Sequence, residues 1–202
     1  NLIEQKITKR TKAILTVDLY GQPANYKAIK KIAHKYKLLL ISDSCQAAGA
    51  LYEGKPILNW TDVSVFSFFI SKNITSGEGG LVLTNNSSIA EKVNLFVNHG
   101  QKRGHKYKII SFGYNFRLTD IQSAILLVQL KRLDGINRKR VDNAAYLYKN
   151  LEGTRGIVLP SILPLAHHVF NRFTLRITKN FPLERDVVKE KLLRDFDVET
   201  EI

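Results

Sequence analysis

The 202-residue chain contains no methionine, a single cysteine and no long apolar run. One cysteine, Cys45, cannot form a disulfide within the chain, which excludes a disulfide-stabilised fold and agrees with a reducing compartment. No segment approaches the roughly 18 consecutive apolar residues of a membrane-spanning helix, and no basic stretch followed by an apolar block opens the chain like a signal peptide. We therefore expect a cytoplasmic protein without a membrane partner.

Acidic residues are scarce beside basic ones: 18 Asp and Glu stand against 31 Lys and Arg, which gives a formal net charge of +13. Such a charge is common in proteins that bind nucleic acid. The basic residues are nevertheless spread along the whole chain, and the densest run, residues 131–140, is interrupted by uncharged and acidic residues. Zinc-finger spacings and RNA-binding aromatic strands are also missing. We expect no nucleic-acid partner, and a basic surface equally suits a small anionic substrate.

The chain starts at Asn1 without an initiator residue, and no glycine or proline stop follows its last helical pattern. We interpret it as a piece of a longer protein. Its length and its 44% hydrophobic content suffice to bury the core of one large domain, or most of one.

The first half alternates between two kinds of apolar pattern. Short, nearly continuous apolar runs predict strands at residues 13–17, 37–42, 63–69 and 80–84. Helical spacing of apolar residues follows the first and the last of these runs, at residues 26–36 and 89–97. Strands that alternate with helices in this way predict an α/β fold with a mostly parallel sheet and flanking helices. Ligands of such sheets bind at the carboxyl ends of the strands.

The second half has a different organisation. One long helical pattern begins at Thr119 and Asp120, which are suited to cap it, and Gly135 is a point where this helix could kink. Farther on, residues 169–177 alternate like a half-buried strand, and residues 183–196 have the pattern of an amphipathic helix. We predict a large domain over residues 1–150, long helix included, and the start of a small α+β domain over residues 151–202.

Two charged residues stand where such a sheet would bind its ligand. Asp43 ends the second predicted strand, and Lys72 follows the third. A lysine and a carboxylate that meet in one crevice form a plausible reactive pair. Position alone leaves the alternative open, because an Asp at a strand end often caps a turn and a Lys before a glycine-rich loop is usually solvated. The histidines lack Cys, His or carboxylate partners at metal-binding spacing, so we predict no metal site.

Four sequence blocks together carry a family resemblance. They read SDSCQAAGALYEGK from Ser42, DVSVFSFFISKNITSGEGGLVLTNN from Asp62, VNHGQ from Val97 and GYNFRLTDIQSAIL from Gly113. In this order they resemble the DegT/DnrJ/StrS family of sugar aminotransferases, which are fold-type-I enzymes dependent on pyridoxal 5'-phosphate (PLP). The resemblance runs from about Ile14 to Ile177. It implies the large PLP-binding domain of that fold, without the family's N-terminal segment and most of its C-terminal domain.

The resemblance implies four cofactor-binding residues in the first half. Lys72 matches the catalytic lysine that forms a Schiff base with PLP, and a desolvated site would lower its pKa and keep its amine neutral. Asp43 matches the aspartate that pairs with the pyridine nitrogen. Gln46 matches a glutamine that contacts the ring face or its phenolic oxygen, and Ser67 matches a serine that binds the phosphate.

Two further residues resemble ones that reach into a neighbouring subunit. Asn115 matches an asparagine that contacts the PLP phosphate, and Arg117 matches an arginine that binds an anionic group of the substrate. The resemblance thus implies a homodimer with shared active sites. Many relatives carry His where this chain has Asp18, which leaves the role of Asp18 open, and we interpret His99 as a loop residue.

The activity implied is transfer of an amino group from an amino acid, usually glutamate, to a keto group of a nucleotide-linked deoxysugar for polysaccharide or glycoconjugate synthesis. Lys72 would serve as the acid and base of the proton shift. Two alternatives remain at this point. Some family members lack the lysine and act as dehydratases, and a partial chain could serve only as a dimerisation or regulatory module. The sugar, the carbon that receives the amino group and the donor are not determined by the sequence.

Overall fold

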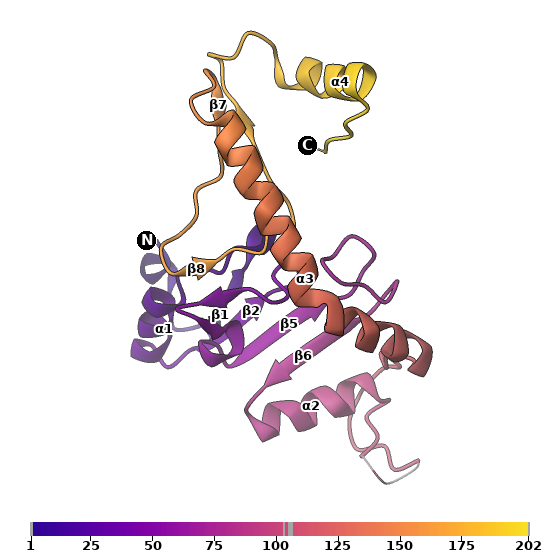
Figure 1. Ribbon diagram of the computed structural model, residues 1–202. Coiled ribbons are helices and arrows are strands. Elements are labelled where there is room, and N and C mark those ends of the chain that lie inside the picture. The colour runs from indigo at the N-terminus through magenta and orange to yellow at the C-terminus, as the bar shows by residue number, and fades with distance from the viewer. Residues whose placement is uncertain (1, 103, 105–106, 202) are drawn as a thin grey trace. The chain divides into compact units, whose positions relative to one another are not determined.

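The computed structural model describes residues 2–102, 104 and 107–201 (Figure 1). The chain divides into two compact units. One comprises the chain up to Val141 together with Ile162–Asn171, and the other comprises Asp142–Ser161 and the chain from Arg172 onward. The long helix α3 (Asp120–Leu151) passes from the first unit into the second. The prediction of a domain boundary at residue 150 remains a prediction.

The first unit is built on a four-stranded sheet with the strand order β1-β2-β5-β6. Its strands are β1 (Ala13–Val17), β2 (Leu39–Asp43), β5 (Val63–Ser67) and β6 (Gly80–Thr84). The first three strands are parallel, and β6 runs antiparallel to β5 (Figure 1). This confirms the predicted α/β class with a mainly parallel sheet. Because Val17 pairs with Asp43 and Asp43 with Val65, the carboxyl ends of three strands meet at one edge.

One face of this sheet is covered by α1 (Tyr26–Lys35), which starts at the cap residue Asn25. The apolar face of α1 joins Ile14 and Leu40 in a buried core. The opposite face is open at β1, where Leu15 is 63% exposed and Val17 49%. Among the described residues only the first face is well covered.

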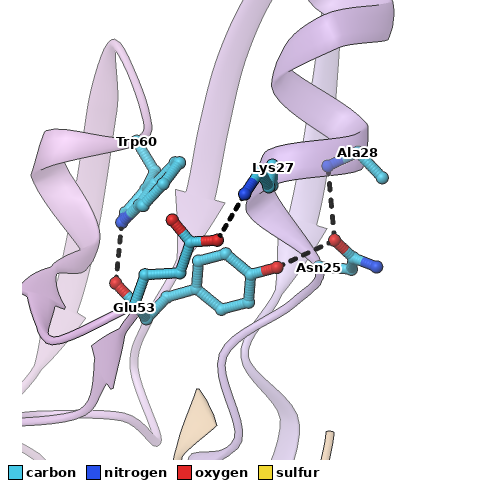
Figure 2. A network of polar contacts seen from close by, with 6 residues as sticks. Asn25, Lys27, Ala28, Glu53 and Trp60 are labelled. Atoms are coloured by element: carbon cyan, nitrogen blue, oxygen red, sulfur yellow. Dashed lines mark hydrogen bonds and ion pairs between the residues drawn. The ribbon is translucent and has the colours of Figure 1, made fainter. Parts of the chain in front are cut away.

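A small sheet braces the start of α1. It has the order β4-β3-β8 and consists of β3 (Leu51–Tyr52), β4 (Lys55–Pro56) and β8 (Ala166–His167). Figure 2 shows the polar network that ties it to α1. The Tyr52 hydroxyl donates to the Asn25 side chain at 2.9 Å, and the Trp60 indole donates to the Tyr52 carbonyl at 3.0 Å. Asn25 thus caps the helix and holds the hairpin at the same time.

Two more helices belong to or begin in the first unit. α2 (Ser87–Val97) follows β6 and packs against it (Figure 1). α3 continues through Gly135 as one helix, so this glycine does not interrupt it. Its residue Leu126 is buried in a second core cluster with Phe68 and Ile74. In the described part of the chain, no helix is both long and apolar enough to cross a membrane.

The second unit contains the end of α3, a pair of short antiparallel strands and a helix. The strands are β7 (Ile157–Val158) and β9 (Arg176–Ile177), and the helix is α4 (Arg185–Phe196). The prediction of a strand over residues 169–177 is therefore wrong except at its end. Val169 is buried in the first unit, where its N–H donates to the Gly21 carbonyl at 3.0 Å. The N–H of Phe170 donates to the His168 ring at 2.9 Å, so these residues do not pair as a strand.

Candidate active site

Lys72 lies in a folded loop after β5. Ser67 is the last residue of β5, and the N–H of Phe68 after it donates to the Gly79 carbonyl at 2.8 Å. The Lys72 N–H then donates to the Phe69 carbonyl at 3.0 Å, which closes a turn. The side chain is half-buried, less enclosed than the sequence suggested. Within residues 2–102, 104 and 107–201, its amine has no hydrogen-bond or ion-pair partner.

Asp43 and Gln46 lie in the turn that follows β2. The Asp43 carboxylate accepts a hydrogen bond from the Cys45 N–H at 3.1 Å and keeps acceptor capacity for a ligand. The Gln46 side-chain oxygen accepts from the Tyr20 N–H at 2.6 Å. Because a backbone N–H can only donate, this contact fixes the orientation of the Gln46 amide and leaves its NH₂ group available as a donor.

Ser67 shares a sheet face with Asp43. Asp43 pairs with Val65 across β2 and β5, and Ser67 follows Val65 by two residues, which returns it to the same face. The Ser67 hydroxyl oxygen accepts from the Phe69 N–H at 3.3 Å, so its hydrogen can still be donated outward.

The Cys45 thiol, which lies between Asp43 and Gln46 in the chain, is influenced by both Asp43 and Lys72. Burial and the negative charge of Asp43 raise the pKa of Cys45 to about 12, and the positive charge of Lys72 opposes this shift. The thiol is therefore within electrostatic reach of both groups. A pKa this high keeps the thiol protonated at neutral pH, which argues against Cys45 as a nucleophile.

Asn115 and Arg117 lie apart from this group. Both are exposed in the loop before α3, where Asn115 forms an isolated bridge with Asn98 and Arg117 donates to the Asn98 side chain at 2.8 Å. Among the described residues neither forms a hydrogen bond with Lys72 or Asp43. Asp43, Gln46 and Ser67 thus lie at or just after the carboxyl ends of β2 and β5, with Lys72 in the loop that follows β5, while Asn115 and Arg117 come from the loop before α3.

Asp18, whose role the sequence left open, is buried directly behind the site. Its carboxylate accepts from the Tyr26 hydroxyl at 2.6 Å, the Ser44 hydroxyl at 2.6 Å and the Ala24 N–H at 2.9 Å. Burial raises the pKa of Asp18, while these hydrogen bonds lower it. The Asp18 N–H also donates to the Asp43 carbonyl at 2.9 Å, so this residue holds the end of β2 in place.

With this geometry established, comparison with known proteins identifies the chain. A model of the DegT/DnrJ/EryC1/StrS aminotransferase family matches residues 1–202, and the chain belongs to this family. It is 37% identical to GDP-perosamine synthase of Caulobacter vibrioides over 94% of this chain and 52% of that enzyme. It is 40% identical to dTDP-3-amino-3,6-dideoxy-alpha-D-galactopyranose transaminase of Aneurinibacillus thermoaerophilus over 87% of this chain and 48% of the relative.

Solved structures agree with the family. The crystal structure of NtdA from Bacillus subtilis with bound cofactor PMP superposes with a TM-score of 0.86 at 33% identity, over 99% of this chain and 45% of that one. The chain thus spans about half the length of the relatives it matches.

Proposed function

We propose that the whole protein is a PLP-dependent aminotransferase that transfers an amino group from glutamate to a keto group of a nucleotide-linked deoxysugar. The observation that carries the proposal is the position of Asp43 and Ser67 at the carboxyl ends of paired parallel strands, with Gln46 and Lys72 in the loops that follow these strands, in a chain of this family.

The chemistry of these side chains fits the cofactor. Lys72 offers an amine that no described residue pairs with for the PLP aldehyde, and Asp43 offers a carboxylate with acceptor capacity for the pyridine nitrogen. Gln46 keeps an NH₂ donor for the phenolic oxygen, and Ser67 a hydroxyl donor for the phosphate. These are the groups that such a molecule requires of its protein.

Bound PLP would supply an electron sink for the bond broken at the substrate carbon. Lys72 would hold the cofactor between turnovers and, once released by the amino donor, would carry the proton from one carbon to the other. Asp43 would keep a proton on the pyridine nitrogen, because a carboxylate beside that nitrogen favours its charged form. Asp18 and Tyr20, which hold Asp43 and Gln46 from behind, would keep these two groups oriented.

The assignment of the acceptor rests on the relatives, whose names specify GDP- and dTDP-linked amino sugars. The chain's net charge of +13 is compatible with such anionic molecules. We propose further that the protein is a homodimer. In it, Asn115 would contact the cofactor phosphate of the neighbouring subunit's site, and Arg117 would bind an anionic group of its substrate.

A coupled assay tests this function. The whole protein, loaded with PLP, is incubated with glutamate and a panel of nucleotide-linked 3-keto and 4-keto deoxysugars, and 2-oxoglutarate is measured. We expect continued formation of 2-oxoglutarate with at least one keto sugar. Without a keto sugar, we expect no more than one equivalent of 2-oxoglutarate per enzyme. Absence of turnover with every sugar, or equal turnover with alanine and glutamate, would contradict the proposed substrates.

A further inference from the structure

Three buried asparagines that are distant in sequence meet directly behind the Lys72 loop. Asn73 follows Lys72, Asn137 lies on α3, and Asn171 follows the small sheet strand β8. The Asn171 NH₂ group donates to the Asn73 side-chain oxygen at 2.8 Å, and the Asn73 NH₂ group donates to the Asn137 oxygen at 2.8 Å. All three side chains are buried. We call this set the asparagine hub.

Backbone carbonyls determine the orientation of each side-chain amide in the hub. The Asn137 NH₂ group donates to the Ala48 carbonyl at 2.9 Å. That of Asn73 also reaches the Val169 carbonyl at 3.4 Å, and that of Asn171 the Ser71 carbonyl at 3.4 Å. Carbonyls only accept, so each NH₂ group must face its carbonyl, and the amide oxygens of Asn73 and Asn137 are left to accept from the neighbouring asparagine.

Two neighbouring residues, Gly49 and Arg140, help to form the hub. Gly49 has a φ of +82°, and a Cβ there would lie 2.5 Å from the Asn137 nitrogen, so a side chain at this position would displace the amide. Arg140, one turn farther along α3, donates to the carbonyls of Phe170 and Asn171 at 3.2 Å each. The segment that carries Asn171 is therefore held to α3 by a second contact.

From these contacts we infer that the asparagine hub positions Lys72 relative to Asp43 and Gln46. The hub joins Ala48, two residues after Gln46, to Ser71 and Asn73, the residues on either side of Lys72. Apolar side chains could fill the same space, but they would not fix how the three segments are oriented. Buried amides do fix it, because each one is costly to bury unless its hydrogen bonds are made. The three asparagines are positioning residues, and the inference rests on the proposed role of Lys72.

The test compares Asn137→Leu with Asn143→Leu in the whole protein. Leucine has nearly the shape of asparagine, is uncharged and makes no hydrogen bond, while Asn143 is exposed on the same helix and serves as the matched control. Hydrogen exchange is followed without cofactor in residues 72–76 and 47–50, with β1 and β2 as reference. With PLP, total bound cofactor and the fraction reducible onto Lys72 are measured separately.

For Asn137→Leu we expect exchange in residues 72–76 and 47–50 to rise about tenfold or more, with β1 and β2 within about twofold of the unmutated protein. The fraction of bound PLP that can be reduced onto Lys72 should fall about tenfold, while total bound PLP at saturation changes little. Asn143→Leu should match the unmutated protein in every respect.

Two results would overturn the inference: Asn137→Leu behaving like Asn143→Leu, or a uniform loss of protection that includes β1 and β2. If Asn137→Leu is insoluble, Asn137→Ala replaces it with the same expectations, and failure of that variant to fold would assign the hub to folding alone. If the unmutated protein never links PLP to Lys72, the proposed function fails. The exchange data would then still decide whether the hub holds the loop.

Discussion

The two groups of candidate site residues differ in what fixes them. Asp43, Gln46 and Ser67 lie at paired strand ends, and with Lys72 they are held from behind by Asp18, Tyr20 and the asparagine hub. Asn115 and Arg117 are exposed on the loop before α3, where Arg117 donates to the Asn98 side chain and the rings of Tyr114 and Phe116 pack against Phe96. The first group is therefore supported from behind by hydrogen bonds to its side chains and strand ends, whereas the second is held by backbone bonds to residues 96–99 and keeps its side chains exposed. The proposed homodimer would place these exposed side chains against a second subunit.

The surroundings of the second group support this reading. Large apolar side chains near Asn115 are exposed, among them Phe112 at 73%, Phe116 at 61% and Ile121 at 76%. Contiguous exposure of this kind usually marks an interaction surface. A second copy of the chain on this surface would bring Asn115 and Arg117 into use, as the proposed homodimer requires.

The largest expected effect comes from the first group. Lys72→Ala should abolish the covalent attachment of PLP and lower transamination by at least about a thousandfold, because it removes the amine that would hold the cofactor and carry the proton. Lys31→Ala, at an exposed lysine of α1, is the matched control and should leave turnover unchanged. Turnover and the visible absorbance of bound cofactor are measured for both. Substantial turnover in Lys72→Ala would remove Lys72 from the centre of the site.

Asp43→Asn should come next. The amide can still accept from the Cys45 N–H, so the turn is retained, but it cannot hold a proton on the pyridine nitrogen. We expect PLP to remain bound and transamination to fall about a hundredfold or more. Asp134→Asn, exposed on α3, controls for the loss of one charge. Near-normal turnover in Asp43→Asn would show that Asp43 only shapes its turn.

Some features of the fold could be predicted from the sequence, and others became visible only in the structure. The strands at 13–17 and 80–84 were predicted residue for residue, because each is a continuous apolar run bounded by turn residues. The alternating pattern over residues 169–177 led to a wrong strand prediction. Val169 is buried by contacts with a distant segment, including Gly21, and local sequence periodicity does not reveal such contacts. The asparagine hub was missed for a similar reason: its members come from three distant segments, and a single asparagine carries no signal of burial. The roles of the site residues themselves rest on resemblance and stay predictions.

Subunit mixing sharpens the contrast between the two groups. If Lys72 and Asn115 of one site come from different chains, a mixed dimer of Lys72→Ala and Asn115→Ala holds one doubly defective site and one intact site. Random exchange between equal amounts of the two variants should then restore roughly a quarter of normal activity.

This experiment requires that Asn115→Ala alone be nearly inactive, which is measured first. If Asn115 serves its own chain's site, every mixed dimer holds two singly defective sites, and mixing restores nothing. That outcome would place both residue groups in one subunit and end the distinction drawn between them.

The smallest expected effect is on the pH dependence of stability, and it comes from the buried side chain of His168. Burial, assisted by the neighbouring His167, lowers the pKa of His168 to about 4 from 6.5, so the folded state binds fewer protons than the unfolded state between these values. Stability from this group is present above pH 6.5 and is lost as the pH falls toward 4. Between pH 7 and pH 5 the loss should be about 2 kcal/mol.

His168→Asn should remove this pH dependence, because the Asn oxygen can accept from the Phe170 N–H without taking up a proton. Urea unfolding at pH 7 and pH 5 measures it, with His34→Asn on the exposed side of α1 as the matched control. Equal pH dependence in the two variants would mean that His168 is not held neutral in the folded state.

The most direct test of the account is chemical trapping of the cofactor. The whole protein, purified with PLP, is reduced with borohydride, digested and mapped by mass spectrometry. We predict a pyridoxyl group on the peptide that contains Lys72, at one per chain, and its absence from that peptide when the cofactor is removed before reduction. Stable labelling of another lysine, or no labelling of a protein that transaminates, would contradict the central claim that Lys72 and Asp43 form the reactive pair of the site.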